Sequence, residues 1–124
     1  MPIEFRAKRI YDSPNDQDCY RILVDRLWPR GVTKQAARID LWAKDFTPSH
    51  ELRKWFHENL LLREEFAARY RMELEESRQL IEATLDSIHN PRIALITAST
   101  DLEYGHAGVL KRFLEEIVSE SGTR

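Results

Sequence analysis

The sequence predicts an α/β fold: a single three-layer domain with a small mixed, mostly parallel sheet of about four strands flanked by helices. Two short runs, within residues 20–25 and 92–98, are almost wholly apolar, as is typical of strands buried on both faces. Polar turn residues follow each run, and the second run leads into a segment with helical periodicity. The 124 residues suit one domain, so we expect residues 1–124 to form it together.

The beginning of the chain predicts a half-buried strand near a sheet edge, because apolar and charged residues alternate over residues 3–9. The polar residues 12–18 predict a turn or loop before the apolar run at 20–25. This connection is too short for a full helical crossover, so the first two strands can be antiparallel. A parallel arrangement stays open if the loop contains a short helical turn.

Two weaker elements are expected next. Thr33 is placed to cap a short helix over residues 34–38, and alternation over residues 39–44 predicts a third, weaker strand. A helix is then expected after Pro48, with Ser49 as its cap.

This helix, with an apolar stripe at helical spacing, is expected to end at Asn59. Residues 62–88 carry two apolar stripes that are out of phase, which predicts two helices with a break near Ser77 or one long bent helix. A final amphipathic helix is expected over residues 103–119. Eight side chains are predicted to be largely buried: Trp55, Phe56, Phe66, Tyr70, Leu74, Leu95, Leu110 and Leu114.

Charged and polar residues follow both apolar runs, at the carboxyl ends of strands, where α/β sheets bind their ligands. The first run is followed by Asp25, Arg26, Trp28 and Arg30, and a polar turn leading to His106 follows the second. If the two strands are parallel neighbours, these residues meet at one edge of the sheet. Arg26 and Arg30 can hold a phosphate or carboxylate in the forked geometry of guanidinium, or can pair with nearby carboxylates.

Three residues near these strand ends are candidate catalytic acid/base groups: Asp25, Asp101 and His106. For Asp25, a carboxylate at a partly buried strand end can have a raised pKa. Each candidate also has a structural interpretation, namely an ion pair for Asp25, a helix cap for Asp101 and a surface position for His106. Trp28 either stacks on a planar ligand or belongs to the core. Lys44 and Tyr104 are expected at the rim of the same pocket.

Composition narrows the function classes further. Residues 1–44 hold nine Lys and Arg against six Asp and Glu, which biases anion binding toward this part of the chain. Cys19 is the single cysteine, so a structural role is expected rather than a disulfide framework or a nucleophile. Motifs for phosphate loops and for metal ligation are absent, so we expect no cofactor and no metal site. No apolar segment has the length of a membrane span, and we expect a cytoplasmic protein.

Three segments resemble a known family: LVDRLWPRG, DLWAKDFTPSHELRKWFHE and ALITASTDLEYGHAGVLKRFL. They are similar, in the same order and over nearly the whole chain, to the YeaO-like branch of domain of unknown function 488. The resemblance implies a small bacterial cytoplasmic α/β protein without a settled activity. It places matching residues at Asp25, Arg26, Trp28, Pro29, Arg30, Gly31, Asp40, Trp42, Lys44, Pro48, Ser49, Arg53, Lys54, Trp55, Phe56, Tyr70 and Asp101.

One departure from the family pattern bears on chemistry. Relatives read Glu-His-Asn where this chain has Glu103, Tyr104 and Gly105, so any role of that His-Asn pair is expected either to have moved to His106 or to be lost. Longer members of the wider family resemble rhodanese-like sheets with a cysteine near this point. No cysteine stands there in this chain, so sulfur transfer is not expected.

Two functions are compatible with these residues. The first is a small enzyme, a hydrolase or transferase that uses acid/base groups without metal and binds a small anionic, nucleotide-like ligand at the carboxyl ends of its strands. The alternative is a non-catalytic regulatory module that binds nucleic acid or a protein. A nucleic-acid module would present five basic residues on one open face: Arg6, Lys8, Arg9, Lys34 and Arg38.

Overall fold

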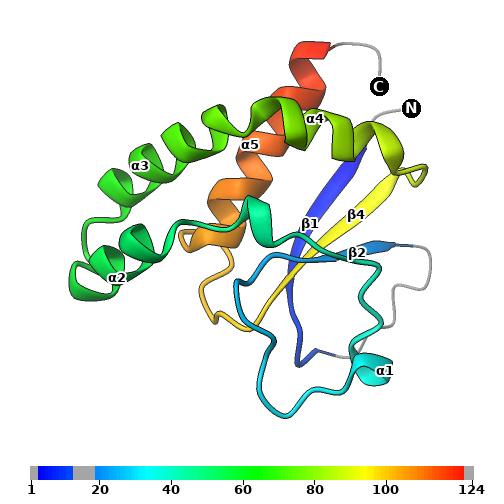
Figure 1. Cartoon of the computed structure of the whole chain (residues 1–124), viewed down its shortest axis with the longest axis horizontal. Coiled ribbons are helices and arrows are strands. Elements are labelled where there is room, and N and C mark those ends of the chain that lie inside the picture. The colour runs from blue at the N-terminus through cyan, green and yellow to red at the C-terminus, as the bar shows by residue number, and fades with distance from the viewer. Residues whose placement is uncertain (1–2, 13–18, 122–124) are drawn as a thin grey trace.

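The computed structural model describes residues 3–12 and 19–121 and shows an α/β fold, with a four-stranded sheet whose described pairings are all parallel (Figure 1). The elements follow in the order β1 (Glu4–Arg9), β2 (Tyr20–Leu23), α1 (Lys34–Ala37), β3 (Leu41–Trp42), the 3-10 helix η1 (Lys44–Phe46), α2 (His50–Glu58), α3 (Arg63–Glu76), α4 (Arg78–Ser87), β4 (Arg92–Thr97) and α5 (His106–Ser121). None of the helices described is both long and apolar enough to cross a membrane.

The most apolar strand, β4, lies inside the sheet and organises it. The strand order is β1-β4-β2-β3, so β4 pairs with β1 on one side and β2 on the other. The predicted parallel pairing of the two apolar runs is therefore confirmed, with Ile22 beside Leu95 in the register. The antiparallel option for the first two strands is wrong, because both strands pair in parallel with β4 and not with each other. Residues 13–18 of the predicted loop between them lie outside the described residues.

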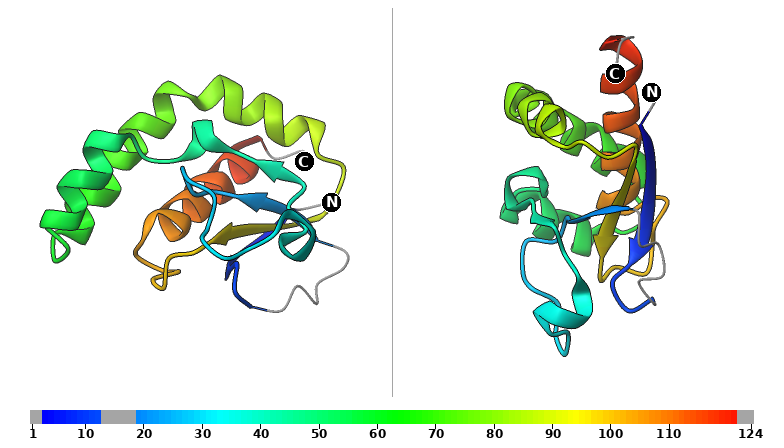
Figure 2. Two further views of the ribbon diagram at one scale, coloured as in Figure 1. Left: turned by 60° about the horizontal axis from the view of Figure 1, so that its bottom comes forward. Right: turned by 90° about the vertical axis from the view of Figure 1, so that its right-hand side faces the viewer.

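The two faces of the sheet are covered unequally. Successive side chains of a strand point to opposite faces, so Ile22 packs with the large core under the long helices while Leu23 packs on the other side. The large core takes buried side chains from α2, α3, α4 and α5, and Figure 2 shows α3 and α4 arching over α5 and the sheet. The opposite face is covered by α1 and the loops around it, with the half-buried Cys19 packed among them. This thin third layer leaves the carboxyl ends of β2 and β4 accessible from the loop side.

Local sequence signals account for where the helices begin and end. The Ser49 side chain accepts a hydrogen bond from the Leu52 backbone N–H (3.1 Å), and Thr33 caps α1 in the same way. Asn59 ends α2, and a break at Ser77 separates α3 from α4, as the phase of the apolar stripes predicts.

Three details differ from the sequence-based expectation. The third strand has only two residues because the chain turns into η1 at Lys44. Trp55 and Phe56 are half-buried rather than buried, since α2 packs mainly on α3, where the Phe56 ring stacks on Phe66 at a centroid distance of 4.0 Å. The last helix begins later than expected, at His106. The other six predicted core side chains are buried.

Replacing Leu95 or Leu110 with Ala should lower the free energy of unfolding by about 2–5 kcal/mol, since both side chains are fully buried and each change leaves a cavity. Leu61→Ala is the matched control, because Leu61 is 94% exposed and its truncation should change stability by less than about 0.5 kcal/mol. Urea melts of the three variants provide the measurement. Losses below about 1 kcal/mol at both buried positions would contradict the assignment of β4 and α5 to the core.

Candidate functional site

The carboxyl ends of β2 and β4 border a hollow of about 590 Å³, here called the sheet-end hollow. Its size falls in the range of small-molecule sites, about 300–1,000 Å³. It is lined by Tyr11, Val24, Asp25, Arg26, Leu27, Trp28, Pro29, Arg30, Thr47, Pro48, Arg53, His57, Phe66, Ala98, Ser99, Thr100 and His106. Five residues expected from the sequence to share a site therefore meet here: Asp25, Arg26, Trp28, Arg30 and His106.

Asp25 joins several segments at the base of this hollow. Its Oδ1 accepts a hydrogen bond from the Thr97 hydroxyl (2.6 Å) and lies 2.9 Å from His106 Nε2, and its Oδ2 accepts from the Ala98 backbone N–H (2.8 Å). The Trp42 indole N–H donates to the Asp25 backbone carbonyl (2.7 Å). Asp25 thus connects the end of β2 to β3, to the end of β4 and to the start of α5.

These contacts determine the charge of Asp25. Burial raises the pKa of its carboxyl, but hydrogen bonds from His106, Thr97 and the Ala98 N–H, together with the charge of His106, outweigh burial and leave the pKa below its ordinary value. An ionised carboxylate only accepts hydrogen bonds, so Nε2 of His106 carries the proton between them. The shift is opposite in direction to the raised pKa that the sequence suggested, because a strand end with three donors stabilises the charge.

Basic side chains from two parts of the chain line the hollow. Arg26 and Arg30 come from the loop after β2, and Arg53 and His57 come from α2. Arg26 Nη1 donates to the Pro48 carbonyl (3.3 Å), and no described carboxylate pairs with Arg26. The structural alternative, an Asp25–Arg26 ion pair, is absent from the described residues, since Asp25 is bound to His106 instead.

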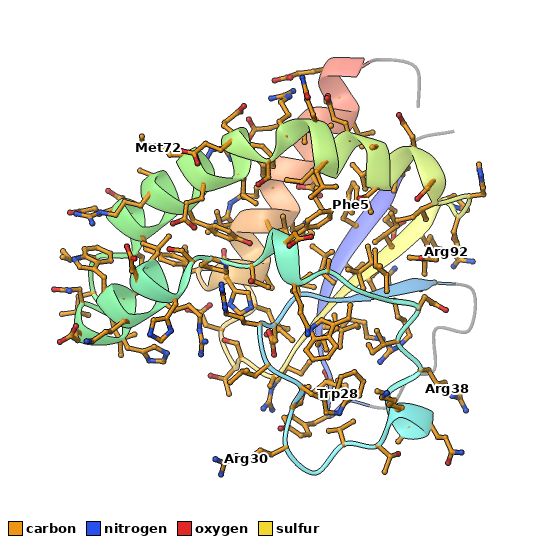
Figure 3. The ribbon with its side chains drawn as sticks, in the orientation of Figure 1. Phe5, Trp28, Arg30, Arg38, Met72 and Arg92 are labelled. Carbon is orange, nitrogen blue, oxygen red and sulfur yellow. The ribbon has the colours of Figure 1, made fainter. Side chains whose placement is uncertain are left out.

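The Arg30 and Arg53 guanidinium groups have no hydrogen bond or ion pair with any residue that the structure describes. Arg30 is exposed at the outer end of its loop (Figure 3). Arg53 is half-buried on the side of α2 that faces the hollow. Across residues 3–12 and 19–121, Asp25 is the one acidic residue that lines the hollow, so its lining carries an excess of positive charge.

Trp28 packs on the core, and its stacking on a planar ligand stays a prediction. Its ring packs on the core cluster on the α1 side of the sheet, and it makes an edge contact with Trp42 at a centroid distance of 5.4 Å. That cluster consists of Ile10, Leu23, Ala37, Ala94 and Ile96. Its indole N–H is bonded to the Val32 carbonyl (2.7 Å), yet the residue also lines the hollow. Exposed Tyr11 and Leu27 add further apolar surface at the opening.

Three residues expected at the site lie outside its lining. The Asp101 carboxylate accepts hydrogen bonds from the Glu103 and Tyr104 backbone N–H groups (3.1 and 2.8 Å). These groups belong to the turn before α5, which begins at His106, so Asp101 stabilises that turn and is not the N-cap of the helix. Lys44 lies over the Trp42 ring, with its Nζ 4.0 Å from the ring centroid. The Tyr104 ring is covered by the Arg63 guanidinium at 4.1 Å. None of the three lines the sheet-end hollow.

Arg53 and His57 are the basic lining residues that the sequence-based reasoning missed as site residues. They are four positions apart on α2 and therefore share a helix face, which is a signal that the sequence contains. The sequence does not show that this helix face points to the hollow, because the orientation of α2 is set by its packing on α3. His57 is exposed at the surface of α2.

In the part of the chain that the structure describes, His106 is hydrogen-bonded to Asp25 and Thr97 and to no hydroxyl or thiol of the lining. The hydroxyl closest to His106, that of Thr97 at 3.4 Å, is fully buried and already donates to Asp25. Among the described residues, no group of three or more His, Cys, Asp or Glu side chains is arranged to hold a metal ion.

Asp25→Asn should lower the free energy of unfolding at neutral pH by about 1–3 kcal/mol. Both carboxylate oxygens of Asp25 accept hydrogen bonds, whereas Asn has one oxygen, so its NH2 group must replace an acceptor and leave a donor of Ala98, Thr97 or His106 unpaired. The folded-state pKa of Asp25 lies below the ordinary value of 3.8. The ionised Asp25 carboxylate therefore stabilises the fold fully above about pH 3.8, and this stabilisation is lost as the pH falls through the folded-state pKa. Urea melts from about pH 3 to pH 7 should therefore show a smaller acid loss for the variant than for the natural chain.

Glu58→Gln serves as the control for this comparison, since Glu58 is exposed at the end of α2 and its replacement should change stability by less than about 0.5 kcal/mol. Equal acid dependence of the natural chain and Asp25→Asn would mean that the Asp25 contacts contribute nothing to folding.

Comparisons with known proteins agree with the sequence resemblance. The family described as "Inactive DUF488-N3 subclade" matches residues 4–123. "Uncharacterized protein YeaO" of Escherichia coli is 36% identical over 115 residues, which cover 93% of this chain and 100% of that protein. "Uncharacterized protein Rv3073c" of Mycobacterium tuberculosis is 39% identical over 112 residues, covering 88% and 92% of the two chains. No solved structure matches significantly. The chain belongs to the DUF488 family, in its inactive N3 subclade.

Proposed function

We propose that the protein binds a small anionic ligand, bearing phosphate or carboxylate groups, in the sheet-end hollow. The observation that carries the proposal is the pair of guanidinium groups, on Arg30 and Arg53, that line the hollow without a described partner. Guanidinium stays charged at any physiological pH and matches phosphate and carboxylate with forked hydrogen bonds. Asp25 is bound to Thr97, Ala98 and His106, which leaves the arginines to an external anion.

Binding without chemical conversion is the form of this function that we favour. The subclade is described as inactive, and the lowered pKa of Asp25 makes its carboxylate a weak base and no acid at neutral pH. His106 Nε2 is bonded to Asp25, and the hydroxyl that lies 3.4 Å from it, that of Thr97, is buried and already donates to Asp25. These points argue for a binding protein over the hydrolase or transferase that the sequence first suggested.

An enzyme is the second candidate, and the Asp25–His106 pair is the observation that favours it. A carboxylate that fixes one imidazole nitrogen leaves the other ring nitrogen to exchange protons with a ligand or a water molecule. In that case His106 would act as the general acid or base, and Asp25 would orient it. The site would then work without a metal or another cofactor.

The remaining parts of the proposal concern location and partners. A chain with one cysteine, Cys19, has no internal disulfide to form, which suits the reducing cytoplasm.

Nucleic acid is less favoured as a partner, because two of the five basic residues that a nucleic-acid module would present are engaged within the protein. Arg6 Nε is 2.8 Å from a Glu4 carboxylate oxygen, and Arg9 donates to the Ala98 carbonyl.

Calorimetric titration with inorganic phosphate tests the proposal. The natural chain should bind phosphate, and the double variant Arg30→Ala/Arg53→Ala should lose at least about tenfold in affinity, since two charge-assisted contacts disappear. Its melting temperature should stay close to that of the natural chain, because neither guanidinium has a described partner.

Lys34→Ala/Lys54→Ala is the matched control, as it removes two positive charges from exposed positions outside the hollow. This control should retain phosphate binding. Equal loss in the two double variants would point to net charge alone, and absence of binding to the natural chain would overturn the proposal.

A further inference from the structure

We infer that the ligand carries two linked anionic groups, as a diphosphate does, with one group bound at the loop after β2 and the other bound at α2. The inference rests on the proposed function and specifies its ligand. It follows from how the cationic side chains are distributed around the sheet-end hollow.

The arginines of the lining come from two parts of the chain, the loop after β2 and the helix α2. Arg30 stands at the outer end of the loop after β2 (Figure 3), whereas Arg53 and His57 project from neighbouring turns of α2 on a shared face. Arg26 lies between them, since it starts in the β2 loop and reaches the Pro48 carbonyl just before α2. A single phosphate held at one of these ends would leave the cationic groups at the other end unused.

The sheet-end hollow has a positively charged lining and enough volume for a ligand of this kind. Three arginines carry three permanent positive charges, and Asp25 offsets one of them in the described lining. The lining therefore has a net charge of about +2, which one phosphate monoester, at about −1.5 to −2 at pH 7, nearly balances. A second anionic group is favoured by the different elements that carry Arg30 and Arg53, not by the number of charges. A hollow of about 590 Å³ is much larger than a phosphate ion and admits a diphosphate together with an attached group.

The attached group has an apolar surface to lie against. Trp28, Leu27 and Tyr11 line the hollow beside Arg26 and Arg30, and Leu27 is 71% exposed. An organic diphosphate would cover this surface, whereas inorganic pyrophosphate would not. The two sources of a diphosphate are therefore distinguishable by their relative affinities.

The test compares calorimetric affinities for inorganic phosphate, inorganic pyrophosphate and ADP. The natural chain should bind pyrophosphate at least about tenfold more tightly than phosphate, because the second anionic group gains charge-assisted hydrogen bonds. Arg53→Gln should lose most of this preference while retaining phosphate binding at the β2 loop. Tighter binding of ADP than of pyrophosphate would show that the ligand is an organic diphosphate. Similar affinities for the two would show that the diphosphate group alone accounts for binding.

Lys54→Gln is the matched control, because it removes the same charge from the adjacent position of α2, outside the lining. It should keep the full preference for pyrophosphate. The inference is overturned if phosphate and pyrophosphate bind the natural chain equally well, or if Arg53→Gln and Lys54→Gln reduce the preference equally. Those results would leave anion binding itself intact, whereas failure of all three anions to bind would overturn the proposed function as well. Thermal melts verify that both variants are folded.

Discussion

The site depends on the hydrogen bonds that the Asp25 carboxylate makes with Thr97, Ala98 and His106. Asp25 follows the fully buried Val24, two positions beyond the end of β2, where an uncompensated charge would be costly. The Thr97 hydroxyl, the Ala98 N–H and His106 compensate that charge, and each comes from a segment distant in sequence. Because the carboxylate is ionised and satisfied within the fold, it ties the ends of β2 and β4 to the start of α5. The nearby arginines consequently remain without this carboxylate as a partner.

Much of the fold follows from short-range patterns in the sequence. The apolar runs around Ile22 and Leu95 are unbroken because both strands are covered on two faces, and this same feature places them side by side in the sheet. Helix caps such as Ser49 are local interactions and are therefore visible in the sequence. The pairing of β1 was not predictable in this way, because alternation identifies a strand without identifying its neighbour. β3 is too short for alternation over residues 39–44 to define it.

The site was partly predictable for the same reasons. Asp25, Arg26, Trp28, Arg30 and His106 follow apolar runs, and the parallel pairing of β2 with β4 brings them to one edge. Local contacts hold Asp101, Lys44 and Tyr104 elsewhere, through a backbone turn and two cation–ring contacts. Arg53 and His57 reach the hollow through the packing of α2 on α3, a tertiary feature that periodicity does not encode. The positive lining thus combines local strand-end chemistry with a helix orientation set by the core.

Hydrogen exchange at the Ala98 backbone amide tests most directly whether Asp25 organises this edge of the sheet. Ala98 follows β4, and its N–H is bonded to the Asp25 carboxylate rather than to a neighbouring strand. Exchange measured by nuclear magnetic resonance should be slow at this amide in the natural chain and much faster in Asp25→Asn. The amides that pair β1 with β4 should remain protected in both proteins. Equal exchange rates at Ala98 in the two proteins would contradict the account.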